Sequence, residues 1–369
     1  MFLSVLQHLY SLRWTLPTAI MMGSSPTFIT VWAAMRTLTI FLPERIYTQA
    51  NDTMYDLYMR LILFFFHSYT GAVVSIYGNA EELLNESCKK NVIFICNHQC
   101  TVDWIVANML ASPQNSIGRI RFILKDGLRF FPLYGFYLHQ RSCIYVRKNG
   151  KFDQEKASKE LALLKDKNLP VWLVIFPEGT RMNPELPQTI EKSQEHAKEQ
   201  GYEPFLHVLS PKVKGIQLAL EQLRSHVESV YDVTIAYNNT IDSDTGHRLP
   251  APGMLEILSL RRPEIHVHFD KIPVEDIPSD EIKLKHWMFT RFQQKDRLMS
   301  HFYSKLPEER GTFPGKSRTL DIPLTKTIPS FLLYSVGLLV LFSTPSGRSC
   351  YWKVSVIGTL TGCLWMSFR

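Results

Sequence analysis

The 369-residue sequence lacks the features that mark several classes of protein. Its six cysteines are too few for a disulfide-stabilised scaffold. Its 18 glycines and 21 prolines do not fit a collagen-like or low-complexity chain. At 45% hydrophobic residues, the chain is too apolar to be disordered. A folded protein remains, and its length suggests about two domains.

Charged residues are absent from four stretches that flank a charged central region: residues 14–35, 61–80, 327–347 and 354–368. A helix of about 20 apolar residues crosses a bilayer, so the first three stretches are long enough and the fourth is shorter. We therefore predict a retained N-terminal membrane anchor within residues 1–80 and a C-terminal membrane hairpin over residues 327–369. Buried core helices are the alternative for these stretches.

Two of the uncharged stretches are not simple membrane helices. Pro17, Gly23 and Pro26 predict a kink or break near the middle of the first. In the second, residues 72–77 alternate enough to form a strand. Residues 61–80 are therefore open to two interpretations, a membrane helix or part of a sheet.

The charged central region, residues 81–326, contains no long apolar run, so we expect it to form one domain on one face of the membrane. Lys316, Arg318 and Lys326 directly precede the C-terminal hairpin. Positively charged flanks favour the cytosolic side of a membrane. The sequence therefore predicts a domain that faces the cytosol.

Short apolar runs in the central region predict buried strands at residues 91–96 and 170–176, as in parallel sheets. Further strands are expected at residues 121–124, 144–147, 231–237 and 265–269, with helices at 102–111, 152–165, 212–227 and 280–305. Strands that alternate with helices predict an α/β fold. Ligands of open α/β sheets bind at the carboxyl ends of strands, so functional residues are expected there.

A histidine and an aspartate follow the first of these strands. His98 comes two residues after the strand, and Asp103 follows five residues later. With His98 in the turn and Asp103 in the first turn of the next helix, the carboxylate bonds one imidazole nitrogen and leaves the other free. Such a pair works as a general base. The alternative is a helix capped by Asn97 and Thr101 beside a passive histidine.

The second strand is followed by the sequence Pro-Glu-Gly-Thr-Arg, residues 177–181. Gly179 permits a tight turn. Thr180 and Arg181 can bind a phosphate, the arginine through its planar fork. Glu178 can orient a donor or a hydroxyl. An ordinary loop with an exposed arginine is the alternative.

Taken together, N-H-x-x-x-x-D and F-P-E-G-T-R about 75 residues later resemble the glycerolipid acyltransferases, in order and in spacing. The similarity extends across the central region and both apolar ends. It implies a mixed sheet flanked by helices, with membrane-embedded helices at the N- and C-terminal ends. It also implies transfer of an acyl group from acyl-CoA to lysophosphatidic acid, giving phosphatidic acid, with no bound cofactor and no metal.

The same resemblance assigns roles to residues of this sequence. His98 is the general base and Asp103 orients it, without an acyl-enzyme. The acceptor-binding positions are Glu178, Gly179, Thr180 and Arg181, with Arg147 and Lys125 as further phosphate-binding candidates. Residues 141–147 match the block G-x-I-F-I-x-R imperfectly, because Arg141 stands where glycine is common. Residues 233–237 stand in for a fourth, proline-rich block.

Some residues near these motifs allow other interpretations. Cys96 and Cys100 flank His98, so a cysteine nucleophile with an acyl-enzyme is an alternative. Lys212 and Lys214 are expected on a solvated helix face, with phosphate binding as the alternative. The aromatic residues 128–138 fit either a membrane interface or a core.

His266 and His268 alternate along a predicted strand. No third ligand is evident beside them, and we expect a partly exposed strand face rather than a metal site.

Lys and Arg together number 41 against 34 for Asp and Glu, a formal net charge of +7. No nucleic-acid recognition motif accompanies this charge, which suits anionic lipids and phosphate-bearing substrates. We expect an integral membrane enzyme of the endoplasmic reticulum, with the mitochondrial outer membrane or nuclear envelope as alternatives. Other open possibilities are a different acceptor, either another lysophospholipid or glycerol 3-phosphate, and a non-catalytic lipid-binding scaffold.

Overall fold

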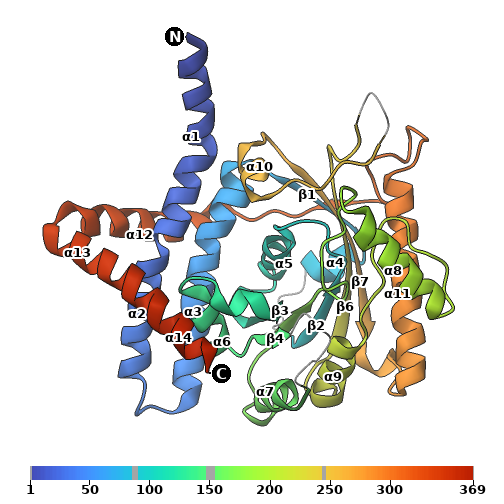
Figure 1. Cartoon of the computed structure of the whole chain (residues 1–369), viewed down its shortest axis with the longest axis horizontal. Coiled ribbons are helices and arrows are strands. Elements are labelled where there is room, and N and C mark those ends of the chain that lie inside the picture. The colour runs from blue at the N-terminus through green and yellow to red at the C-terminus, as the bar shows by residue number, and fades with distance from the viewer. Residues whose placement is uncertain (1, 85–89, 147–153, 243–246, 369) are drawn as a thin grey trace.

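A mixed β-sheet with helices on both faces forms the centre of the computed structural model (Figure 1), which describes residues 2–84, 90–146, 154–242 and 247–368. Within these residues the sheet has eight strands in the order β4-β3-β5-β2-β6-β7-β1-β8. The strands are β1 (Val73–Gly78), β2 (Val92–Cys96), β3 (Ile120–Lys125), β4 (Ile144–Val146), β5 (Trp172–Ile175), β6 (Ser229–Tyr237), β7 (Glu264–Pro273) and β8 (Arg318–Thr319). The predicted α/β fold with a mixed sheet is confirmed.

Five neighbouring strands, β4, β3, β5, β2 and β6, run parallel. β7 is antiparallel to β6, β1 is parallel to β7, and β8 is antiparallel to β1. Every residue of β2 and β5 is buried, which explains why both strands are continuously apolar. The carboxyl ends of the five parallel strands consequently lie along one edge of the sheet, and the motif residues follow three of them.

The uncharged stretch 61–80 belongs to the fold of the central domain. Its first part is the end of α3 (Glu44–Leu63) and a π-helical turn, Phe64–Tyr69, and its last part contains β1. Leu61, Phe66, Val74 and Ile76 are buried, so the stretch lacks charge because it packs against the sheet. The strand interpretation is confirmed and the membrane-helix interpretation of residues 61–80 is wrong. The sheet therefore begins before residue 81, the predicted start of the domain.

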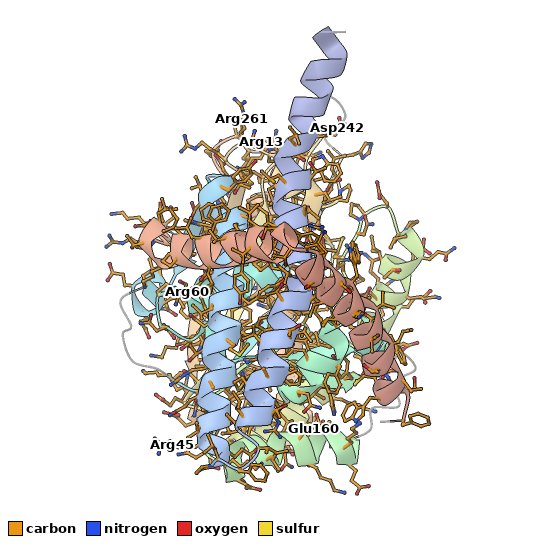
Figure 2. All side chains as sticks on the ribbon, turned by 90° about the vertical axis from the view of Figure 1, so that its left-hand side faces the viewer. Arg13, Arg45, Arg60, Glu160, Asp242 and Arg261 are labelled. Carbon is orange, nitrogen blue, oxygen red and sulfur yellow. The ribbon has the colours of Figure 1, made fainter. Side chains whose placement is uncertain are left out.

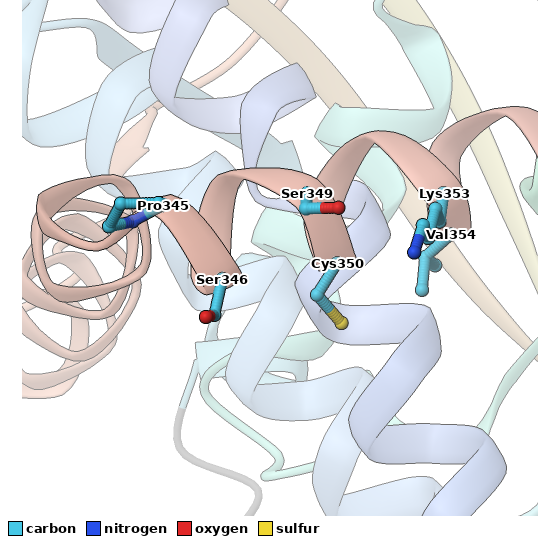
Figure 3. A pocket seen from close by; sticks show the side chains of 6 residues that line it. All are labelled: Pro345, Ser346, Ser349, Cys350, Lys353 and Val354. Atoms are coloured by element: carbon cyan, nitrogen blue, oxygen red, sulfur yellow. The ribbon is translucent and has the colours of Figure 1, made fainter.

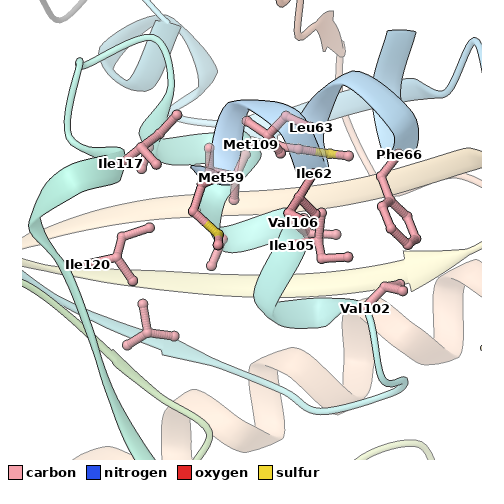
Figure 4. Packing of buried hydrophobic residues seen from close by; sticks show 14 of the residues in the cluster. Met59, Ile62, Leu63, Phe66, Val102, Ile105, Val106, Met109, Ile117 and Ile120 are labelled. Atoms are coloured by element: carbon pink, nitrogen blue, oxygen red, sulfur yellow. The ribbon is translucent and has the colours of Figure 1, made fainter. Parts of the chain in front are cut away.

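Helices cover both faces of the sheet. One face carries α3 and α5 (Asp103–Ala111), and Figure 4 shows Met59 and Ile62 of α3 beside Val106 and Met109 of α5. The other face carries α7 (Gln154–Asp166), α8 (Pro187–Glu199), α9 (Lys214–Leu223) and α11 (Glu281–Phe302). The predicted helices correspond to α5, α7, α9 and α11, and α8 was not predicted. Short helices connect the strands: α4 (Ala80–Leu84), α6 (Tyr134–Gln140) and α10 (Met254–Ser259).

The N-terminal stretch forms α1 (Phe2–Gly23) and α2 (Ser25–Leu38), which meet at Ser24. The predicted break near Gly23 and Pro26 is confirmed. Leu12, Leu16 and Val31 expose about half of their surface. Whether these helices anchor the chain in a membrane stays a prediction.

At the other end, α12 (Leu324–Ser343) is the one helix of the described residues that is long and apolar enough to cross a membrane. Figure 2 shows it lying across α1 and α3. The chain then turns into α13 (Pro345–Lys353) and α14 (Thr359–Ser367), and α14 packs on α6. An open hollow lined in part by Ser346, Cys350 and Lys353 (Figure 3) lies on α13 and not at the strand ends.

The aromatic stretch 128–138 is partly exposed and partly buried, and contact with a membrane interface stays a prediction for its exposed residues. Phe130 and Phe131 are exposed, whereas Tyr137 is buried. Helix α14 covers part of the stretch, with Trp365 in edge contact with Phe136 at a ring distance of 5.0 Å. The C-terminal helix α14 therefore lies against the aromatic stretch.

Candidate active site

His98 and Asp103 come together where β2 ends and α5 begins. His98 Nδ1 lies 2.7 Å from Asp103 Oδ2. The aspartate side chain is fully buried, whereas the histidine side chain is 21% exposed. Because Nδ1 is engaged by the carboxylate, Nε2 is the nitrogen available to accept a proton. The arrangement is that of a general base supported by a buried acid.

Asp103 accepts several hydrogen bonds besides the one from His98. The backbone N–H groups of Gln99 and Cys100 donate to Oδ2 at 2.7 and 3.0 Å. The hydroxyl of Tyr237 donates to Oδ1 at 2.6 Å. The carboxylate also opens helix α5, where the helix dipole favours a negative charge. These contacts give both oxygens of the fully buried carboxylate hydrogen-bond donors.

Asn97 ties this turn to strand β6. Its side-chain N–H donates to the carbonyl of Ile235 at 3.0 Å, and its side-chain oxygen accepts the N–H of Ile235 at 2.7 Å. The alternative prediction was that Asn97 caps the helix after β2. Its side chain instead links β2 to β6. This link places the end of β6, including Tyr237, over the dyad.

The turn after β5 supports the histidine from the other side. Glu178 is 2% exposed, and its Oε1 accepts the backbone N–H of His98 at 2.9 Å. The carbonyl of His98 accepts the N–H of Met182 at 2.8 Å. Burial raises the pKa of Glu178 well above its usual value. One carboxyl oxygen of Glu178 therefore holds the backbone of the His98 turn, and the substrate-binding role predicted for this residue stays a prediction.

The rest of that turn faces outward. Thr180 is half-buried and Arg181 is exposed. Gly179 has a φ of +67°, and a Cβ there would lie 3.0 Å from Nζ of Lys212. The backbone N–H of Lys212 donates to the carbonyl of Pro177 at 2.8 Å. Lys212 precedes α9 instead of lying on it, and its ammonium sits over the Gly179 turn.

Three other basic residues named in the sequence analysis are Lys125, Arg147 and Arg141. Lys125 ends β3 and is exposed, at the same edge of the sheet as His98. Arg147 lies outside the described residues. Arg141 is 1% exposed, and its guanidinium donates to the carbonyls of Asn51 and Gly118 at 3.1 and 2.7 Å. This arginine therefore anchors α3 to the loop before β3.

The cysteines beside His98 are unsuited to nucleophilic catalysis. Cys96 and Cys100 are 0% and 1% exposed, and burial raises the pKa of both thiols well above the usual value. A nucleophilic cysteine needs a stabilised thiolate. The acyl-enzyme alternative thus loses its chemical basis.

No group of three metal-ligating side chains occurs in the part of the chain that the structure describes. His266 is buried, with Nδ1 3.0 Å from the hydroxyl of Tyr77, so the expectation of a partly exposed face is wrong for it. His268 remains 18% exposed beside Asp270.

Tyr237 is the site residue that sequence reasoning did not assign. A signal was present, because residues 231–237 were predicted as a strand and a parallel neighbour of β2 ends at the same edge. The pairing of β6 with β2 was not predictable from either strand by itself, since the two lie more than a hundred residues apart.

Comparison with known proteins finds two family models that match successive parts of the chain. Residues 75–238 match the family model described as Acyltransferase, and residues 256–334 match the model described as Acyltransferase C-terminus. The chain is 40% identical over 370 residues to the 1-acyl-sn-glycerol-3-phosphate acyltransferase epsilon of Mus musculus, covering 100% of both chains.

Two further relatives are more distant. A probable 1-acyl-sn-glycerol-3-phosphate acyltransferase 5 of Arabidopsis thaliana is 31% identical, with 62% of this chain and 56% of the relative covered. The crystal structure of the 1-acyl-sn-glycerophosphate acyltransferase PlsC from Thermotoga maritima aligns with a TM-score of 0.42 and 17% identity. That alignment covers 80% of this chain and 100% of PlsC.

Proposed function

This chain belongs to the 1-acyl-sn-glycerol-3-phosphate acyltransferases, and we propose that it transfers an acyl group from acyl-CoA to the sn-2 hydroxyl of lysophosphatidic acid. The product is phosphatidic acid. The observation that carries the proposed mechanism is the 2.7 Å contact between His98 Nδ1 and Asp103 Oδ2, which leaves Nε2 free at an exposed strand end.

In this mechanism His98 Nε2 takes the proton of the acceptor hydroxyl as the oxygen attacks the thioester carbonyl. The new C–O ester bond forms, the C–S bond breaks, and CoA leaves with the proton that His98 returns. Asp103 stabilises the imidazolium while it exists. General-base help of this kind accelerates a reaction by about 10²- to 10⁴-fold.

Positive side chains around the Gly179 turn are proposed to bind the acceptor phosphate. Arg181 is exposed beside the histidine turn, and the ammonium of Lys212 lies over Gly179. Lys125, at the end of β3, extends the positive edge, and Arg147 stays a sequence-based candidate. An arginine fork and nearby ammonium groups suit a phosphate, because charge-assisted hydrogen bonds are the strong ones.

Family membership and the apolar helix α12 indicate that the chain associates with a membrane. We propose an endoplasmic reticulum location with the active site facing the cytosol, and the mitochondrial outer membrane or nuclear envelope as the alternatives. Immunogold labelling of cells, with and without permeabilisation of the organelle membranes, separates these locations and the two orientations.

The test of the activity uses the full chain in phospholipid vesicles with labelled oleoyl-CoA. Lysophosphatidic acid, lysophosphatidylinositol and glycerol 3-phosphate are offered as separate acceptors. We expect label to enter phosphatidic acid, and His98→Ala to lower the rate at least 100-fold. His286→Ala is the matched control, because His286 is exposed on α11 and bonds only the surface residue Tyr202 among the contacts described here.

Two results overturn the proposal in different ways. Release of CoA with another acceptor and not with lysophosphatidic acid changes the substrate. Lipid binding without CoA release from any acceptor supports the scaffold alternative.

A further inference from the structure

Strand β6 delivers a tyrosine hydroxyl to the acid of the dyad. Tyr237 is the last residue of β6 and is 2% exposed. Its hydroxyl lies 2.6 Å from Asp103 Oδ1. We propose that Tyr237 is a positioning residue that orients Asp103 and lowers the proton affinity of His98, an inference that rests on the proposed function.

The backbone holds Tyr237 in this position. Residues 229–233 of β6 pair with the five residues of β2, with Val233 opposite Cys96. Beyond that point Asn97 makes two hydrogen bonds to the backbone of Ile235, two residues before Tyr237. The end of β6 is thereby fixed to the turn that carries His98. The tyrosine hydroxyl needs no side-chain adjustment to meet the carboxylate.

The two oxygens of Asp103 have different partners. Oδ2 accepts from His98 and from two backbone N–H groups. At Oδ1 the donor is Tyr237. Loss of this donor leaves a buried acceptor without its partner, which carries the full desolvation penalty of that group. Without this hydrogen bond, the plane of the carboxylate that directs Oδ2 at His98 is less firmly fixed.

The same hydrogen bond affects the charge that His98 experiences. A donor to Oδ1 withdraws part of the negative charge, so less of it stabilises the imidazolium. The other groups that act on this carboxylate are His98 and Cys100 in its own turn and Glu178 in the turn after β5. Arg181 acts electrostatically on Cys100, and Lys295 of α11 acts on Glu178.

The tyrosine remains a donor throughout the working range. Burial, followed by the charge of Asp103, raises the pKa of Tyr237 well above its usual value. A hydroxyl that stays protonated donates the same hydrogen bond to Asp103 throughout this range. A difference between the pH profiles of the wild type and a Tyr237 variant therefore does not come from titration of the tyrosine itself.

The experiment compares Tyr237→Phe with Tyr231→Phe in the full chain. Both tyrosines lie on β6 and both are buried, but the Tyr231 hydroxyl contacts Gln114 instead of the dyad. We measure kcat/KM for lysophosphatidic acid between pH 5.5 and 9. For Tyr237→Phe we expect the acidic midpoint to rise by about half a unit to one unit. The plateau should fall on the order of tenfold, and Tyr231→Phe should match the wild type in midpoint.

A double-mutant cycle separates action through Asp103 from general loss of packing. If Tyr237 acts through the aspartate, Asp103→Asn with Tyr237→Phe is no slower than Asp103→Asn alone. An unshifted midpoint in Tyr237→Phe, or additive losses in the cycle, overturns the inference while wild-type activity upholds the proposed function. Absence of acylation by the wild type overturns the proposed function first.

Discussion

Two buried polar clusters lie along β6 and differ in how their charges are satisfied. The dyad cluster, His98, Asp103, Glu178 and Tyr237, sits at the carboxyl edge of the sheet. The ion-pair cluster, Asp232, Asp270, Arg291 and Lys295, lies under helix α11. Lys295 Nζ is 2.5 Å from Asp232 Oδ1, and Arg291 bridges Asp232 and Asp270. Two positive charges there meet two negative charges.

The contrast shows how surroundings separate a structural charge from a functional one. Burial opposes ionisation of Asp232, but Lys295 and Arg291 outweigh it and hold its pKa below the usual value. Every charge of that cluster is neutralised by a partner, and these ion pairs join α11 to β6. Asp103 is instead satisfied by hydrogen-bond donors, and its imidazole partner keeps one nitrogen free. An imidazole nitrogen that is left free in this way can carry out proton transfer.

The largest effect is expected from a substitution that breaks the ion-pair cluster. Lys295→Ala leaves Asp232 buried with Arg291 as its remaining partner, so the free energy of unfolding should fall by about 3–5 kcal/mol. Urea unfolding of the full chain in detergent measures it. The control is Lys283→Ala, an exposed lysine on the same helix. Equal stability of the two variants would contradict a structural role for the cluster.

The next effect concerns the exposed lysine beside the dyad cluster. Lys212→Met should raise KM for lysophosphatidic acid by about 10- to 150-fold, because a charge-assisted contact of roughly 1.5–3 kcal/mol is lost, and leave stability unchanged. Lys214→Met, two residues away and also exposed, serves as the control. Measuring KM for oleoyl-CoA in the same variants distinguishes the acceptor phosphate from the phosphates of CoA. Unchanged KM for both substrates would remove Lys212 from the site.

The smallest effect tests the buried carboxyl of the dyad cluster. The pKa of Glu178 is raised in the folded state, so the native protein binds more protons there and loses stability as pH rises through that pKa. Glu178→Gln keeps an oxygen that can accept the N–H of His98 but no longer titrates. Between pH 6 and 9 its melting temperature should fall less than that of the wild type, by on the order of a few °C. Parallel melting curves would show that Glu178 titrates as it does in the unfolded chain.

Sequence periodicity accounted for most of the central sheet. Strands were predicted at the positions of β3, β4, β6 and β7. The apolar runs of β2 and β5 were predictable because burial on both faces leaves a continuous apolar pattern. The stretch at residues 61–80 was ambiguous for the same reason. A segment without charge satisfies either a bilayer or a protein core, and contacts with the sheet decided for the core.

The sequence by itself predicted the contact between His98 and Asp103, because they are five residues apart and meet across one strand-to-helix turn. It also set the residue types of the turn at residues 177–181, which is proposed to bind phosphate. Only the tertiary structure decided that Glu178 points inward, that Lys212 lies over Gly179 and that Tyr237 reaches Asp103. These contacts join residues 33 to 134 positions apart, so strand order and register set them, and no local pattern records that register.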